Sequence, residues 1–214
     1  MIVLEKEGMT MTNKKELFLK WTKNLYNVQL ALLVCGVLTA IPLLGNVFSW
    51  VSRILTLVVV YILYQLAPVS DRYRKAAIFS GIATVAGLLL VAEVGIIISI
   101  VVLICSLVGT YQEYTAHSDI LEGIDNSLAR KWHSLFNWEV FGGIFLGVLI
   151  SPIVVLLTVF LVLDANLLTA ITLIVVTGFD LILDIVYLTL LKRTRAQYEA
   201  FPEHMGNAQS GDYI

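Results

Sequence analysis

Two aspartates within an otherwise apolar segment are the residues of this 214-residue chain whose chemistry is most informative. Asp180 and Asp184 are four residues apart, so in a helix they project from the same face. Two carboxylates about 6 Å apart in a medium of low dielectric do not both ionise easily. Thr177 and Tyr187 extend the same stripe at helical spacing. These four residues are expected to form a polar seam, which either joins helices structurally or binds a proton, a cation or another small ligand.

The segments around these residues are too apolar for an ordinary soluble domain. Hydrophobic residues make up 58% of the chain and charged residues only 14%, whereas globular domains carry about 25% charged residues. A helix needs about 20 apolar residues to cross a bilayer core. We therefore predict an all-α polytopic membrane protein with six transmembrane helices in three hairpins, at residues 25–44, 47–66, 76–92, 94–109, 141–163 and 167–191.

The third and fourth of these spans are short. Residues 76–109 form one apolar run that only Glu93 and Gly95 interrupt. A single helix of that length would be about 50 Å long, which is more than the hydrocarbon core accommodates. We expect two crossings with a turn at residues 93–95, and a re-entrant hairpin that crosses only partly is the alternative.

The basic residues are distributed asymmetrically about the predicted spans. Of the 14 Lys and Arg residues, all but Arg53 lie in the N-terminal tail (1–24), the second and fourth connections, or the C-terminal tail (192–214). Cytoplasmic segments of membrane proteins carry an excess of Lys and Arg. The distribution predicts that both termini lie in the cytoplasm and that an even number of spans joins them.

Two polar segments border the spans. Residues 13–16 have the spacing of a capping box and begin a short amphipathic helix in the N-terminal tail. We expect this helix to anchor the chain at the membrane surface, with binding of a partner as the alternative.

Residues 111–138 form the larger polar segment, an amphipathic cytoplasmic elbow between the fourth and fifth spans. We expect Gly123 to break it into two helices, with Asp125 or Asn126 as the cap of the second. Its acidic residues are expected to face the basic pair Arg130 and Lys131: Glu113, Asp119, Glu122 and Asp125. Two of its tryptophans are expected at headgroup level: Trp132 and Trp138.

A second charged site is expected at the outer end of the membrane domain. Arg53 lies about 9 Å from the end of its span at 1.5 Å per residue. Glu93 and Asp164 lie in hairpin turns at that end, and we expect either one to pair with Arg53. The alternatives are that the Arg53 side chain extends outward to water or attracts an anion in an outer vestibule.

Small residues in the fifth span predict close helix packing. Gly143, Gly147 and Ser151 recur at four-residue spacing, which lets two helices approach closely. Pro152 follows directly and is expected to kink the helix.

Several classes of function lack support in the sequence. The net charge of −2 gives no sign of nucleic-acid binding. The two cysteines, Cys35 and Cys105, are far apart in apolar runs and are expected to be inert thiols. Glu113 and His117 share a helix face, but the spacing typical of a metal site is absent, and we expect neither a metal nor a cofactor. Motifs of known enzyme classes are also absent.

The remaining hypotheses concern the membrane itself. The first is binding or translocation of a small solute or ion, or a subunit of a transport complex, based on Asp180, Asp184 and Arg53. The alternative is a non-catalytic scaffold or regulator that recruits a cytoplasmic protein partner through residues 111–138.

Two stretches of the sequence are similar to stretches in known proteins. Residues 111–125 read Tyr-Gln-Glu-Tyr-Thr-Ala-His-Ser-Asp-Ile-Leu-Glu-Gly-Ile-Asp, and residues 67–74 read Ala-Pro-Val-Ser-Asp-Arg-Tyr-Arg. Together they resemble small multi-span membrane proteins of Gram-positive bacteria. The resemblance implies a bacterial plasma membrane and a similar topology, and it implies no particular activity.

Overall fold

The computed structural model describes residues 10–39, 44–89, 96–144 and 165–201, and all regular structure in these ranges is α-helical. This confirms the all-α class. The helices are α1 (Met11–Thr39), α2 (Gly45–Gln65), α3 (Asp71–Leu89), α4 (Ile96–Leu121), α5 (Asn126–Ile144) and α7 (Ala165–Ala200). Several predicted features lie outside the described residues: most of the span at 141–163, with Gly147, Ser151 and Pro152, and the turn residues Glu93 and Asp164.

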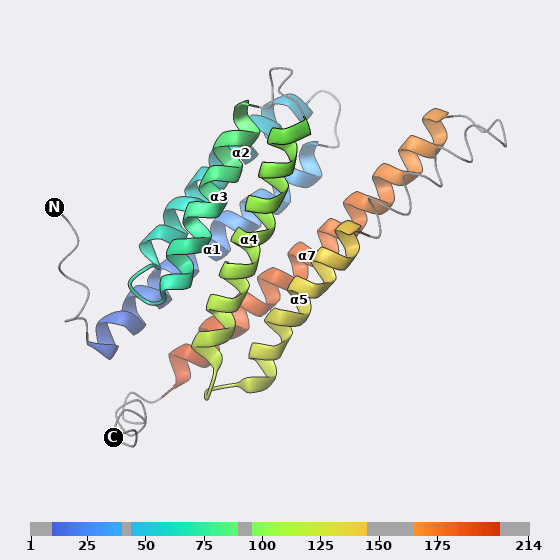
Figure 1. Cartoon of the computed structure of the whole chain (residues 1–214). Helices are drawn as coiled ribbons and strands as arrows, with labels where there is room; N and C mark the ends of the chain where they lie inside the picture. The colour runs from blue at the N-terminus through green and yellow to red at the C-terminus, as the bar shows by residue number, and fades with distance from the viewer. Residues whose placement is uncertain (1–9, 40–43, 90–95, 145–164, 202–214) are drawn as a thin grey trace.

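Helices that follow one another in the chain pack side by side, from α1 to α5 (Figure 1). The C-terminal helix α7 contacts α1, α4 and α5, so it joins the first helix of the bundle to the α4–α5 pair. Among these contacts the one between α3 and α4 is especially close. A Cβ atom on Gly109 would lie 3.1 Å from the backbone nitrogen of Ser80, so the absence of a side chain allows this approach.

Three of the described helices are long and apolar enough to cross a membrane: Gly45–Gln65, Ile97–Leu121 and Ile174–Ala200. Their outward faces expose large apolar side chains, such as Val47 at 61%, Ile97 at 78% and Ile174 at 71%. Exposed apolar surface of this kind is expected where lipid, and not water, covers the protein. The structure therefore supports a helical protein associated with a membrane.

Four connections and chain ends meet at one end of the bundle. They are the start of α1, the α2–α3 connection at residues 66–70, the α4–α5 turn at residues 122–125 and the end of α7 (Figure 1). We call this the basic end, because the Lys and Arg residues of the described chain other than Arg53 lie in or next to these segments.

The hydrophobic core lies toward the basic end. All six described helices contribute fully buried members, among them Phe18 and Leu25 of α1, Leu63 of α2, Tyr73 of α3, Leu121 of α4, Trp132 of α5 and Leu191 of α7. The best-packed part of the described bundle is thus the part that also holds its polar side chains.

The structure differs from the predicted elbow at residues 111–138. Residues 111–121 continue α4 without a break, and α5 begins at Asn126 and continues past Trp138. Between them, Gly123 has a φ of 83°, a left-handed conformation that favours glycine. The side chain of Asp125 caps α5, accepting hydrogen bonds from the Leu128 and Ser127 backbone N–H groups at 2.9 and 3.1 Å. The predicted break and cap are confirmed, but the segment is the tip of a helical hairpin.

The position of Trp132 corrects a second expectation. Its side chain is fully buried in the protein core, while Trp138 is 57% exposed. The apolar stripe of α5 that contains Trp132 faces α4 and α7, because it shares the buried cluster with Leu121 and Tyr187. An apolar stripe has the same spacing whether it contacts lipid headgroups or neighbouring helices, which explains the wrong prediction.

Candidate functional site

Polar side chains from four helices meet inside the core at the basic end. We call them the polar core, and they comprise Tyr73 of α3, Glu113, Tyr114 and His117 of α4, Trp132 of α5, and Tyr187 and Thr194 of α7. Each is less than 9% exposed. Buried polar groups require hydrogen-bond partners, so the pairing within this set determines what it can do.

Glu113 and His117 lie one turn apart on the inward face of α4. The Tyr187 hydroxyl donates a short hydrogen bond to the Glu113 carboxylate. His117 lies with Nδ1 2.8 Å from the Tyr73 hydroxyl, and its ring stacks on Trp132 with centroids 4.5 Å apart. One face and one nitrogen of this histidine are therefore held by aromatic side chains.

The second ring nitrogen of His117, Nε2, is buried and has no hydrogen-bond partner among the described residues. If the Tyr73 hydroxyl donates to Nδ1, the ring proton of the neutral imidazole is on Nε2. This N–H then has no acceptor in the described part of the core, which is unusual for a buried donor. Burial also raises the pKa of Tyr73 well above its ordinary value, with a smaller contribution from Glu113, so its hydroxyl keeps its proton.

Two further hydrogen bonds connect the polar core across helices. The Trp132 indole N–H donates to the Thr194 hydroxyl at 2.9 Å, which joins α5 to α7. The Tyr114 hydroxyl donates to Glu139 at 2.8 Å, which joins α4 to α5. Glu139 is thus an additional acidic residue next to the polar core.

Four carboxylates on α7, α5 and α4 lie close enough together that the charge of each interacts with that of the next. Burial is the main factor that raises the pKa of Glu139, and the carboxylates of Asp184 and Asp180 raise it further, against the lowering effect of the Tyr114 hydrogen bond. Glu139 is also close enough to Glu113 for their charges to interact. We call Asp180, Asp184, Glu139 and Glu113 the acidic row. Its exposure falls along the row, from exposed at the two aspartates to 7% at Glu113.

The residues predicted to form one polar stripe on α7 differ in their surroundings. Tyr187 is buried, as a member of the polar core, whereas Thr177 is exposed among the described residues. Glu139 was not predicted as part of any site, and Glu113 was expected to face the basic pair of residues 130 and 131. Instead it faces Tyr187, and Asp119 of the same segment pairs with Arg72 of α3.

A close contact between α5 and α7 lies next to the acidic row. A Cβ atom on Gly142 would overlap the ring of Phe179, the residue before Asp180. Gly143, which was expected to pack closely, has nothing within 4 Å of its Cβ position among the described residues. Within the described part of α5, the close contact is made by Gly142.

Arg53 lies in the half of α2 that is farther from the basic end. Its guanidinium carbon is 5.0 Å from the centroid of the Trp50 ring, a cation–π geometry. Both of its predicted acidic partners lie outside the described residues, so the outer ion pair stays a prediction.

The site also lacks a metal-like cluster within the described ranges, where no three His, Cys, Asp or Glu side chains gather in a way that could hold a metal ion. Comparison with protein-family models, with curated proteins and with solved structures finds no match to this chain. The geometry of the acidic row and the polar core is therefore the basis for a functional proposal.

Proposed function

We propose that this chain is an integral membrane protein that binds a proton or a small cation at the acidic row and moves it, alone or with a small solute. The observation that carries the proposal is the buried carboxylate of Glu113, whose hydrogen-bond partner among the described residues is a tyrosine hydroxyl and not a cation. A buried carboxylate without a cationic partner is costly when ionised, so the group is neutralised by a proton or by a bound cation.

The order of the carboxylates supports movement as well as binding. Asp180 lies about 16 Å along α7 from Leu191, at 1.5 Å per residue. Asp184 is one turn nearer. The charge of Glu139 interacts with those of Asp184 and Glu113, and Glu113 is hydrogen-bonded to Tyr187, which lies nearer still to Leu191 along α7. Tyr114 and Tyr187 each donate a hydroxyl to one of these carboxylates, so the row also contains groups that relay protons.

The proposed setting follows from the charge distribution. The basic end faces the cytoplasm of a bacterial plasma membrane, with both termini on that side and six spans between them. The acidic row then leads from the interior of the membrane to the cytoplasmic surface. Acidic residues within spans are usually placed facing such pathways, because a charge in contact with lipid is costly.

A ligand-dependent stability measurement tests the binding step. The purified full-length chain in detergent is melted over a range of pH and with Li⁺, Na⁺ or K⁺, at constant ionic strength. A cation that binds only the folded state raises its stability by about 2.7 kcal/mol at a hundredfold excess over its Kd. We expect a stabilisation in the wild type that is lost in the double variant Asp180→Asn/Asp184→Asn and in Glu113→Gln.

The matched control is Glu122→Gln, which neutralises an exposed carboxylate at the end of α4. It should keep the wild-type response. If no cation and no change of pH distinguishes the wild type from the acidic-row variants, the proposal is wrong. The alternative function, a scaffold that recruits a cytoplasmic protein, would then use the outward face of α5, because the inward face is buried.

A further inference from the structure

Two hollows lie on α7 where the apolar part of this helix gives way to basic sequence. The larger has a volume of about 560 Å³ and lies between α1 and α7. Apolar side chains line most of it, including Leu30 and Leu33 of α1 and Ile185 and Leu188 of α7. Lys192 and Arg193 line the same hollow. We call it the α1–α7 groove.

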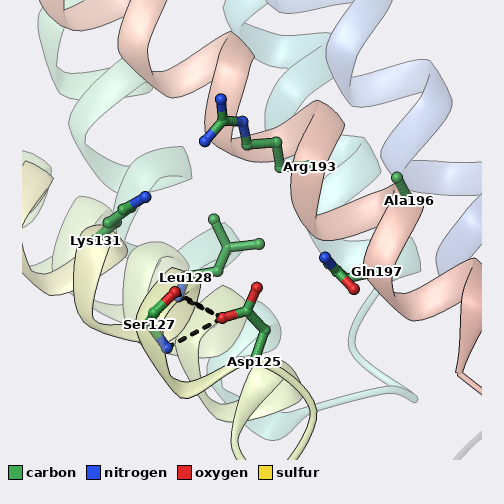
Figure 2. A pocket seen from close by; sticks show the side chains of 7 residues that line it. All are labelled: Asp125, Ser127, Leu128, Lys131, Arg193, Ala196 and Gln197. Atoms are coloured by element: carbon green, nitrogen blue, oxygen red, sulfur yellow. Dashed lines mark hydrogen bonds between the residues drawn. The ribbon is translucent and has the colours of Figure 1, made fainter.

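The smaller hollow has a volume of about 330 Å³ and lies between α7 and the start of α5 (Figure 2). Figure 2 shows Lys131 and Arg193 extending toward one another across this space. Arg193 and Ala196 line both hollows, so the two adjoin at these residues. Three basic side chains therefore surround one region next to an apolar groove.

The acidic residue that lines this region, Asp125, already has hydrogen-bond partners within the protein. Asp125 lines the smaller hollow, but its Oδ1 atom accepts three hydrogen bonds at the start of α5, from the backbone of Ser127 and Leu128 and from the Ser127 hydroxyl. These bonds hold the carboxylate against the helix terminus (Figure 2). The basic side chains of residues 131, 192 and 193 outnumber it, and a ligand with a negative charge fits the remaining space.

We infer that this region is a binding site for one anionic phospholipid. Its phosphate lies among Lys131, Lys192 and Arg193, and one acyl chain lies in the α1–α7 groove. The groove runs along α7 from Ile185 to Ala196, a distance of about 16 Å at 1.5 Å per residue. An acyl chain that lies beside a span follows the same direction. The basic side chains lie where α7 leaves its apolar segment, which is the depth of lipid phosphates.

The shape of the groove favours a lipid over other anions. A free phosphate would use the basic side chains and leave the apolar groove empty. A peptide in the groove would place backbone N–H and C=O groups at hydrocarbon depth, where they lack partners. A phospholipid satisfies both parts, because its charged and apolar ends are covalently joined.

This lipid site is independent of the proposed ion pathway. Residues 185, 188, 192 and 196 recur at helical spacing on one side of α7. Asp184 and Tyr187 lie on a different face, at an angle of roughly 85° or more from the centre of that side. Loss of lipid binding therefore tests the groove and not the acidic row.

Native mass spectrometry of the full-length chain provides the test. The detergent-purified protein is incubated with phosphatidylglycerol or with phosphatidylcholine of identical acyl chains, and the lipid-bound fraction is measured. We expect preferential retention of one phosphatidylglycerol, with an affinity lowered roughly thirtyfold in Lys192→Gln/Arg193→Gln, since each basic residue near an anionic headgroup contributes on the order of fivefold. The control Lys75→Gln/Arg130→Gln removes two exposed charges from the same end outside the two hollows and should retain the lipid.

A second variant separates the acyl chain from the charge. Leu30→Trp fills the groove and keeps every basic side chain, so it should also lose the lipid. An excess of glycerol phosphate should not displace phosphatidylglycerol from the wild type. Equal retention of the two lipids, equal loss in the control pair, full retention by Leu30→Trp, or displacement by glycerol phosphate would each overturn the inference.

Discussion

The hydroxyl of Tyr187 on α7 donates a hydrogen bond to the carboxylate of Glu113 on α4, and both side chains are buried. The two residues are far apart in the sequence, so the bond forms only when the last helix packs onto the α4–α5 pair. It links the acidic row to the polar core at the most buried carboxylate of the row. Changes at these two positions should therefore affect stability and ion binding differently.

Removing the donor should destabilise the fold. Tyr187→Phe leaves Glu113 buried without its hydroxyl partner, which costs about 1–3 kcal/mol of unfolding free energy. Glu113→Gln keeps an acceptor for the Tyr187 hydroxyl and removes the charge, so it should be nearly neutral or stabilising. Denaturant unfolding in detergent measures both, with Tyr61→Phe, an exposed tyrosine of α2, as the control. An equal loss of unfolding free energy in Tyr187→Phe and Glu113→Gln would contradict a stabilising role of the Tyr187–Glu113 hydrogen bond.

The Trp132–Thr194 hydrogen bond should also stabilise the folded protein. Thr194→Val keeps the volume of a fully buried side chain but leaves the indole N–H unpaired. We expect a loss of about 1–3 kcal/mol, compared with less than about 0.5 kcal/mol for the exposed Thr189→Val. Thermal unfolding followed by tryptophan fluorescence reports the difference. A Thr194→Val protein as stable as the wild type would contradict the burial of Trp132 against α7.

The α5–α7 contact predicts a difference between two adjacent glycines. Gly142→Ala places a Cβ against the Phe179 ring and should cost about 1–3 kcal/mol. Gly143→Ala meets nothing among the described residues, and it should be neutral or slightly stabilising because alanine favours a helix by about 1 kcal/mol. Phe179→Leu should partly restore the stability of Gly142→Ala. Equal effects of the two substitutions on stability would contradict the close contact between Gly142 and Phe179.

Asp125 should make the stability depend on pH in a defined direction. The Leu128 N–H, and then the groups of Ser127, lower the pKa of its carboxyl. The charged form therefore stabilises the folded protein above the ordinary aspartate pKa of about 3.9, and this contribution is lost as the pH falls through the lower, folded-state pKa.

Asp125→Asn keeps a cap that does not titrate, so its stability relative to the wild type should improve as the pH is lowered from 7 to 3. Asp125→Ala removes the cap and should cost about 1 kcal/mol at pH 7. Unfolding curves at several pH values compare the three proteins. A wild-type advantage over Asp125→Asn that stays constant over this range would contradict the assignment of the cap.

The helical class and the cap at Asp125 could be predicted from the sequence because both depend on local signals. Long apolar runs and a short polar residue before a helix identify them without knowledge of packing. The burial of Glu113 could not be predicted in this way, since it depends on the approach of α7. Its four-residue spacing from His117 was the available signal, and this spacing alone does not indicate which neighbour the helix face meets.

The burial of Trp132 also could not be predicted from spacing along one helix. The spacing predicts an apolar stripe on α5, but it does not show that the stripe contacts α4 and α7 and not the bilayer surface. The gathering of Asp180, Asp184, Glu139 and Glu113 likewise combines three helices that the sequence separates. Spacing along one helix predicted the two aspartates, and only the fold adds the two glutamates.

The central claim is that the acidic row conducts protons or a small cation, and flux in proteoliposomes tests it most directly. The full-length chain is reconstituted with a pH-sensitive dye inside, and uptake is followed after a membrane potential or a cation gradient is imposed. We predict flux in the wild type and in Glu122→Gln, and its loss in Glu113→Gln and in Asp180→Asn/Asp184→Asn. Flux that is absent from the wild type, or that persists unchanged in both acidic-row variants, would contradict the claim.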